Sequence, residues 1–121
     1  MRAVTLAAAL AAALVAASPG ASASSAHARR PAVTIRFGEF FYRPAAVTVH
    51  VGQPVRFLNV GKIAHTVADT DAKGHIRSRL IRPRPLGHGQ SQTVTFAEPG
   101  VVHYVCTFHP TLMRGTITVV R

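Results

Sequence analysis

Short segments that alternate apolar and polar residues constrain the fold of this 121-residue chain more than any other feature. Beyond residue 31 the apolar residues recur with a period of two, which is typical of half-buried β-strands, and Gly, Pro and polar residues separate the segments. The expected strands cover residues 32–37, 46–51, 55–59, 64–68, 92–96, 101–106 and 116–120. We therefore predict an all-β fold, a single-domain β-sandwich with Greek-key connections.

The segment from residue 71 to residue 91 departs from this pattern. It is rich in Arg, Pro and Gly, and it offers only Ile76, Leu80, Ile81 and Leu86 for burial. We expect a loop or an irregular edge structure here.

The N-terminus has the features of an export signal. Arg2 supplies the charged region, residues 3–17 form the apolar run, and residues 18–20 (Ser-Pro-Gly) interrupt it. Cleavage after Ala23 and cleavage after Ala28 both satisfy the preference for small residues, so the sequence leaves both open. A membrane anchor is disfavoured because the apolar run is shorter than the roughly 20 residues that span a bilayer.

These features divide the chain into three parts. We expect a signal peptide at 1–23, a disordered leader at 24–31 and the folded domain at 32–121. Export predicts a periplasmic, extracellular or cell-envelope location. An exported domain of this size often relies on disulfides, but the chain has a single Cys, so reactivity or a metal must explain that residue.

A copper-binding donor set lies near the C-terminus. Cys106, His109 and Met113 occur together in CTFHPTLM, and His65 lies about forty positions upstream. One thiolate and two imidazoles in a plane, with a thioether on the axis, form the ligand set of a mononuclear type 1 copper site. This mixture suits both Cu(I) and Cu(II), because sulfur donors favour Cu(I) and imidazoles accept either ion.

Other histidines compete with these candidates. His50 is the rival of His65, but it alternates with the valines of its strand and should point to solvent. Strand parity places Val102, Tyr104 and Cys106 on one face, and His103 and Val105 on the other. A second, weak surface metal site could use His75, His88 or His27, although solvated side chains explain these residues as well.

Two long stretches carry a family resemblance: FFYRPAAVTVHVGQPVRFLNVGKIAHTV and EPGVVHYVCTFHPTLMRGTITVV. The chain resembles the small cupredoxins, which are blue type 1 copper proteins such as plastocyanin, pseudoazurin and amicyanin, and amicyanin resembles it more than the other two. The similarity covers residues 33–120. The resemblance implies a cupredoxin-like sandwich with His65, Cys106 and His109 as equatorial ligands and Met113 as the axial ligand.

The resemblance also implies a surface where electrons enter or leave, and the sequence differs from the family pattern at two points. It places the ring of His109 at the surface, in an apolar patch for which Pro110, Leu112 and Leu86 are candidates. Thr66 occupies a position that is often Asn in the family, and its hydroxyl could bond to Thr107 or its backbone. The spacing from His109 to Met113 is one residue longer than in amicyanin and resembles that of azurin.

These observations predict an exported protein that carries single electrons between redox partners by outer-sphere transfer and is not an enzyme. The chain lacks the His-x-His pairs of a trinuclear oxidase cluster, and its only carboxylates, Glu39, Asp69, Asp71 and Glu98, lie in expected turns or loops. The alternative is copper storage or delivery to an oxidase, which the single Met beyond the signal disfavours. A fold retained only as an interaction module is a third hypothesis.

The excess of positive charge predicts acidic partners. Fourteen Lys and Arg against four Asp and Glu favour redox partner proteins with an acidic docking surface, or association with an anionic cell surface. Arg77, Arg79, Arg82 and Arg84 form a docking candidate, and a solvated loop explains them equally well. We expect a monomer that binds no nucleic acid, because the chain is exported and has no basic motif interleaved with aromatic residues.

Overall fold

The computed structural model describes residues 3–5, 9, 11–16 and 30–121. The described residues form eight strands and no helix, so none of them belongs to a helix that could cross a membrane. Both expected cleavage sites and most of the expected leader lie outside these residues. The strands are β1 (Val33–Gly38), β2 (Phe41–Arg43), β3 (Ala46–His50), β4 (Val55–Asn59), β5 (Ala68–Thr70), β6 (Ser91–Val94), β7 (Gly100–Val105) and β8 (Arg114–Val120).

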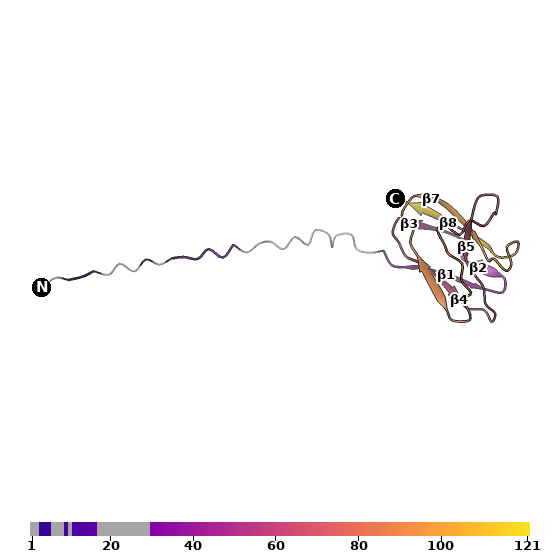
Figure 1. Cartoon of the computed structure of the whole chain (residues 1–121), viewed down its shortest axis with the longest axis horizontal. Helices are drawn as coiled ribbons and strands as arrows, with labels where there is room; N and C mark the ends of the chain where they lie inside the picture. The colour runs from indigo at the N-terminus through magenta and orange to yellow at the C-terminus, as the bar shows by residue number, and fades with distance from the viewer. Residues whose placement is uncertain (1–2, 6–8, 10, 17–29) are drawn as a thin grey trace.

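Two four-stranded mixed sheets form the domain (Figure 1). One has the order β2-β1-β4-β6 and the other the order β3-β8-β7-β5. The pairs β1–β4 and β3–β8 are parallel, and the other neighbours are antiparallel. The predicted all-β, single-domain fold is confirmed.

The core lies between the sheets and includes inward residues of both. Phe37 of β1, Phe57 of β4 and Ile117 of β8 are completely buried, and burial of each such side chain contributes about 1.5–3 kcal/mol. Tyr104 of β7 packs edge-on against Phe57, with ring centroids 5.3 Å apart, and against Tyr42 of β2 at 4.8 Å. These aromatic contacts join the two sheets.

Most strand predictions agree with the structure to within one or two residues, and the predicted strand at 64–68 is wrong. His65 makes an isolated bridge with Leu86, and the strand of this region is β5, which begins at Ala68. The backbone of Thr66 bonds to side chains, because its N–H points to the Cys106 sulfur and its carbonyl accepts from Tyr42. Pairing therefore stops at the single bridge of His65 and does not extend into a strand.

The parity prediction for β7 is confirmed for the inward face. Val102, Tyr104 and Cys106 are buried, and His103 is half-buried on the opposite face. Val105 shares that outer face and is nevertheless buried. It pairs with Ala68 of β5 and with Arg114 of β8, so strands flank it on both sides.

The irregular segment predicted at 71–91 is confirmed except for Ser91, which begins β6, and the carboxylate of Asp69, expected in a turn, anchors the segment. Asp69 lies in β5 and is buried; its Oδ1 accepts from the backbone N–H groups of Leu80 (2.8 Å) and Ile81 (2.7 Å). Of the apolar residues in the segment, Ile81 and Leu86 are buried, whereas Ile76 and Leu80 are exposed. Asp69 thus anchors the segment to the sheet.

Candidate metal centre

Three connections meet at one end of the sandwich. They are the turn after β1 (residues 39–40), the segment after β4 (residues 60–67) and the loop between β7 and β8 (residues 106–113). β1 and β4 are parallel, so their C-terminal ends lie at the same edge. In Figure 1 the 106–113 loop lies at the end of the domain opposite to the point where the chain enters it.

Cys106 and His65 come together inside this end. Both are completely buried, and Cys106 Sγ lies 3.9 Å from His65 Nδ1. Metal–nitrogen and metal–sulfur bonds of about 2.0 and 2.3 Å, separated by 120°, would place two such donors about 3.7 Å apart. The observed separation therefore matches one edge of a trigonal metal site.

The loop after Cys106 is closed by its own backbone. Cys106 donates to the carbonyl of Met113 (3.1 Å), and His109 and Met113 donate to the carbonyls of Cys106 (3.2 Å) and His109 (3.0 Å). Met113 is completely buried and His109 is half-buried. Three of the four candidate ligands thus belong to one internally bonded turn.

Exposed apolar residues, here called the apolar rim, contact the His109 ring or lie in the same loop. The His109 ring lies 5.7 Å from the His65 ring and 4.5 Å from the Phe40 ring, between centroids. Phe40, Phe108 and Leu112 are 45%, 53% and 64% exposed. Leu86, a candidate for this patch from the sequence, is buried in the hydrophobic core, so that expectation is wrong.

The other candidate histidines make different contacts. His50 pairs with Val120 at the far end of β8, whereas Met113 immediately precedes the start of β8. His75 Nδ1 pairs with Asp71 (2.9 Å), and His88 Nδ1 bonds to the carbonyl of Gly61 (2.7 Å). His27 lies outside the described residues.

Among the described residues, no three or more His, Cys, Asp or Glu side chains are gathered closely enough to hold a metal ion by themselves. This applies to the expected second surface site and to the main centre alike. At the main centre the Cys106 Sγ to His65 Nδ1 distance suits a shared metal, and the His109 ring lies next to the His65 ring. These three side chains are therefore close to one another, but their donor atoms do not all converge on one point.

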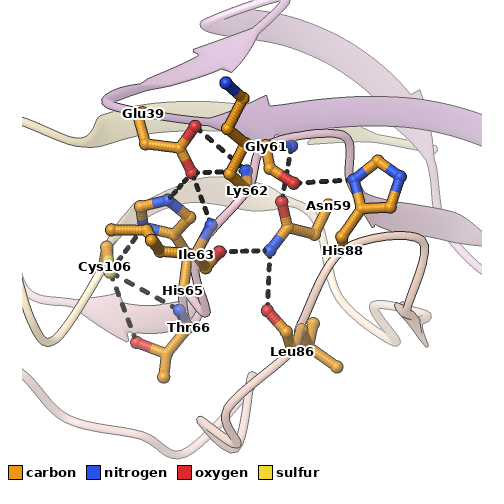
Figure 2. A network of polar contacts seen from close by, with 10 residues as sticks. All are labelled: Glu39, Asn59, Gly61, Lys62, Ile63, His65, Thr66, Leu86, His88 and Cys106. Carbon is orange, nitrogen blue, oxygen red and sulfur yellow. Dashed lines mark hydrogen bonds and ion pairs between the residues drawn. The ribbon is translucent and has the colours of Figure 1, made fainter.

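Glu39 holds the ring of His65, a role that the sequence did not reveal (Figure 2). Its Oε1 lies 3.1 Å from His65 Nε2 and accepts from the backbone N–H groups of Ile63 (2.9 Å) and Lys62 (2.8 Å). The backbone hydrogen bonds from Ile63 and Lys62, followed by the contact with His65, lower the pKa of Glu39 to about 2. An ionised carboxylate only accepts, so Nε2 donates to Glu39, and Nδ1 is the ring nitrogen on the side of Cys106.

Asn59 fixes the segment that carries His65. It is completely buried, its Nδ2 donates to the carbonyls of Ile63 (2.9 Å) and Leu86 (2.7 Å), and its Oδ1 accepts from Gly61 N–H (2.7 Å) (Figure 2). A sequence signal for this role exists, because Asn59 lies on the apolar parity of its strand, where a polar residue needs partners.

Thr66 ties the two ligand segments together. Its N–H lies 3.4 Å and its Oγ1 3.7 Å from Cys106 Sγ, and its Oγ1 accepts from Thr107 N–H (2.8 Å). The two threonine hydroxyl oxygens are 2.7 Å apart. The expected bond between Thr66 and Thr107 is confirmed, so a hydroxyl here links the same segments that an Asn often links in the family.

Comparison with known proteins identifies the family. Residues 30–120 match the copper-binding proteins of the plastocyanin/azurin family. The chain belongs to this family. Its sequence is 32% identical to amicyanin of Paracoccus versutus over 88 residues, which are 73% of this chain and 64% of that protein. The chain thus spans less than two thirds of the length of this relative.

Solved structures agree with the assignment. A purple cupredoxin from Nitrosopumilus maritimus superposes with a TM-score of 0.66 at 29% identity, over 75% of this chain and all of that one. A reduced Cu(I) form of an amicyanin variant gives a TM-score of 0.64 at 25% identity, over 79% of this chain and 89% of that one.

Family membership identifies one type 1 copper ion as the cofactor of this cupredoxin. The residues present fit that ion, because a buried thiol faces an imidazole nitrogen whose partner nitrogen is already committed to a carboxylate. A soft sulfur donor combined with imidazole selects copper over hard, oxygen-seeking cations.

Loss of the Glu39 carboxylate should weaken copper binding. We expect Glu39→Ala to lower the affinity about 10–100-fold, because the His65 ring loses the partner that sets its tautomer and orientation. Competition with a Cu(I) chelator measures this affinity. Glu98→Ala is the matched control, since Glu98 is exposed and lies beside Val51 and Arg121, at the end of β8 away from the 106–113 loop. Equal affinities of the two variants would contradict the assigned role.

Proposed function

We propose that this cupredoxin carries single electrons between redox partner proteins, with His65, Cys106 and His109 as equatorial copper ligands and Met113 as the axial ligand. The observation that carries the proposal is the buried pair of Cys106 Sγ and His65 Nδ1, 3.9 Å apart, beside the backbone-closed loop of His109 and Met113. Bound copper supplies the one-electron Cu(II)/Cu(I) couple.

The surroundings of these residues support fast outer-sphere transfer. Backbone hydrogen bonds within the 106–113 loop, together with Glu39, Asn59 and Thr66, hold the donor side chains in place. Little rearrangement is then needed when the charge at the site changes, which keeps the barrier low. The apolar rim at Phe40, Phe108 and Leu112 lets a partner approach the half-buried His109 ring without stripping water from charged groups.

We propose no bond-making reaction for this site. The nearest carboxylate, Glu39, accepts hydrogen bonds from two backbone N–H groups and contacts His65, so its hydrogen bonds serve to position the His65 segment. A general acid or base must reach the proton that it transfers.

The proposal includes an exported protein with acidic partners. The signal-like N-terminus supports a periplasmic or cell-envelope location, and the excess of Lys and Arg over Asp and Glu, of which only Arg2 lies in the expected signal, supports acidic docking surfaces. Arg77, Arg79, Arg82 and Arg84 are all exposed on the irregular segment, where a partner can reach them.

Reconstitution with Cu(II) tests the function. We expect one equivalent to give an intense visible thiolate-to-copper absorption, a type 1 electron paramagnetic spectrum and reversible one-electron voltammetry. Tight Cu(I) binding without a stable Cu(II) form would instead favour copper delivery. A colourless protein with an ordinary cupric spectrum would rule out the electron-carrier proposal.

A further inference from the structure

A hollow outside the metal centre lies on the outer face of the β3-β8-β7-β5 sheet. Its volume is about 390 Å³, and the turn at residues 71–74 borders it. His103 of β7 pairs with Thr70 of β5 on one side and with Thr116 of β8 on the other, so these three side chains share the outer face. The hollow therefore has a floor of sheet residues and a wall formed by a turn.

The charged groups that line the hollow are mostly cationic. The cations are Lys73 and Arg114, which line it beside the half-buried His103, and Asp71 is the only acidic residue among the lining residues. Within the described part of the chain, neither Lys73 nor Arg114 has a carboxylate within ion-pair distance. The cationic groups are thus available to a ligand.

The carboxylate of Asp71 is already committed to the turn. Its Oδ1 accepts from the backbone N–H groups of Lys73 and His75, both at 2.9 Å. Its Oδ2 accepts from Arg77 (2.8 Å) and contacts His75 Nδ1 (2.9 Å). These bonds, led by the backbone of His75, hold the pKa of Asp71 well below its usual range. Asp71 therefore stabilises the turn that borders the hollow, and Arg77 neutralises the charge of the Asp71 carboxylate.

Arg114 connects the hollow to the candidate ligand loop. Its Nε donates to the carbonyl of Pro110 (3.1 Å), the residue after His109. Its guanidinium lies beside Gly74, because a Cβ added at Gly74 would be 3.4 Å from Arg114 Nη2. The guanidinium is thus held between the ligand loop and the turn, with its terminal N–H groups toward the turn.

We propose that this hollow binds an oxyanion group, a phosphate or a carboxylate, between Lys73 and Arg114, with Thr116 and His103 as further donors. A guanidinium and an ammonium that line the same concave site suit the charge and hydrogen-bonding needs of such groups. The group comes from a free anion or from an acidic side chain of another protein. In the second case the carboxylate of a partner protein would be bound beside the loop of His109. This docking role rests on the proposed function.

Nuclear magnetic resonance of the Cu(I) protein tests the proposal at constant ionic strength, with inorganic phosphate and hexaglutamate as separate probes. We expect saturable amide shifts centred on Lys73, His103 and Arg114. Lys73→Gln combined with Arg114→Gln should weaken binding at least tenfold, whereas Arg36→Gln combined with Arg56→Gln should change it less than twofold. The control pair removes the same charge from exposed positions on the other sheet.

The two probes distinguish the sources. Binding of phosphate alone would assign the hollow to a free anion, and tighter binding of hexaglutamate, with competition by phosphate, would assign it to a protein carboxylate. If neither probe shifts these residues, or both variant pairs weaken binding equally, the proposal is wrong. Lys73→Gln alone guards against misfolding, because the Lys73 side chain is exposed. Visible absorption of the Cu(II) form reports the metal centre separately, so failure of one proposal does not imply failure of the other.

Discussion

Cys106→Ser should abolish the thiolate-to-copper absorption completely and lower copper affinity by more than a hundredfold. The thiolate is the strongest donor of the proposed set and the source of the visible transition, and a hydroxyl at neutral pH replaces neither property. Serine is close to cysteine in size, so the buried position opposite His65 should keep its packing. Absorption and electron paramagnetic spectra after addition of Cu(II), with chelator competition for the affinity, measure the effect.

A matched histidine variant separates ligation from proximity. His103 precedes Cys106 by three residues but lies on the outer face of β7, so His103→Gln should keep the absorption and the spectrum unchanged. His109→Gln, in contrast, should remove the type 1 spectrum. A blue Cys106→Ser protein, or a His103→Gln protein as colourless as His109→Gln, would exclude the proposed ligand set.

The parts of the structure that depend on neighbouring residues could be predicted from the sequence. The strand at 55–59 agrees at both ends, because its alternation reflects burial on one face. The loop of Cys106, His109 and Met113 was identifiable because its spacing is short and its own backbone closes it. Local pattern and local hydrogen bonding coincide in both cases.

The parts that depend on distant residues could not be predicted. Glu39 reaches His65 across 26 positions, and nothing near Glu39 in the sequence marks it as the partner of a histidine. The contact between Phe40 and His109 likewise has no signal in the sequence near Phe40. β2 was missed because three residues are too few to establish alternation, and Pro44 follows them directly. Asp69 was placed in a turn because the hydrogen-bond donors that allow its burial come from Leu80 and Ile81.

The second large effect concerns stability and comes from Gly115. This residue pairs with Tyr104 across β7 and β8, and a Cβ added at Gly115 would overlap the Tyr104 ring. The ring cannot move aside freely, because Tyr42 and Phe57 pack against it at 4.8 and 5.3 Å. We therefore expect Gly115→Ala to lower the free energy of unfolding by about 3 kcal/mol, at the upper end of the usual cost of overpacking. Denaturant titration of the metal-free protein measures this change.

The reason for the loss can be isolated by a double-mutant cycle. If overlap with the ring is the cause, Gly115→Ala should cost much less in a Tyr104→Leu background, because the shorter side chain leaves room for the methyl group. Thr118→Ala is the control on the same strand, and it should stay within about 0.5 kcal/mol of the parent, because Thr118 is only partly buried. Additive costs for Gly115→Ala and Tyr104→Leu would show that the glycine is required for another reason.

The same overlap should also disturb the copper spectrum. Tyr42 packs on Tyr104 and donates to the carbonyl of Thr66 at 2.6 Å, and the N–H of Thr66 points to the Cys106 sulfur. A shift of the Tyr104 ring should therefore reach the surroundings of Cys106.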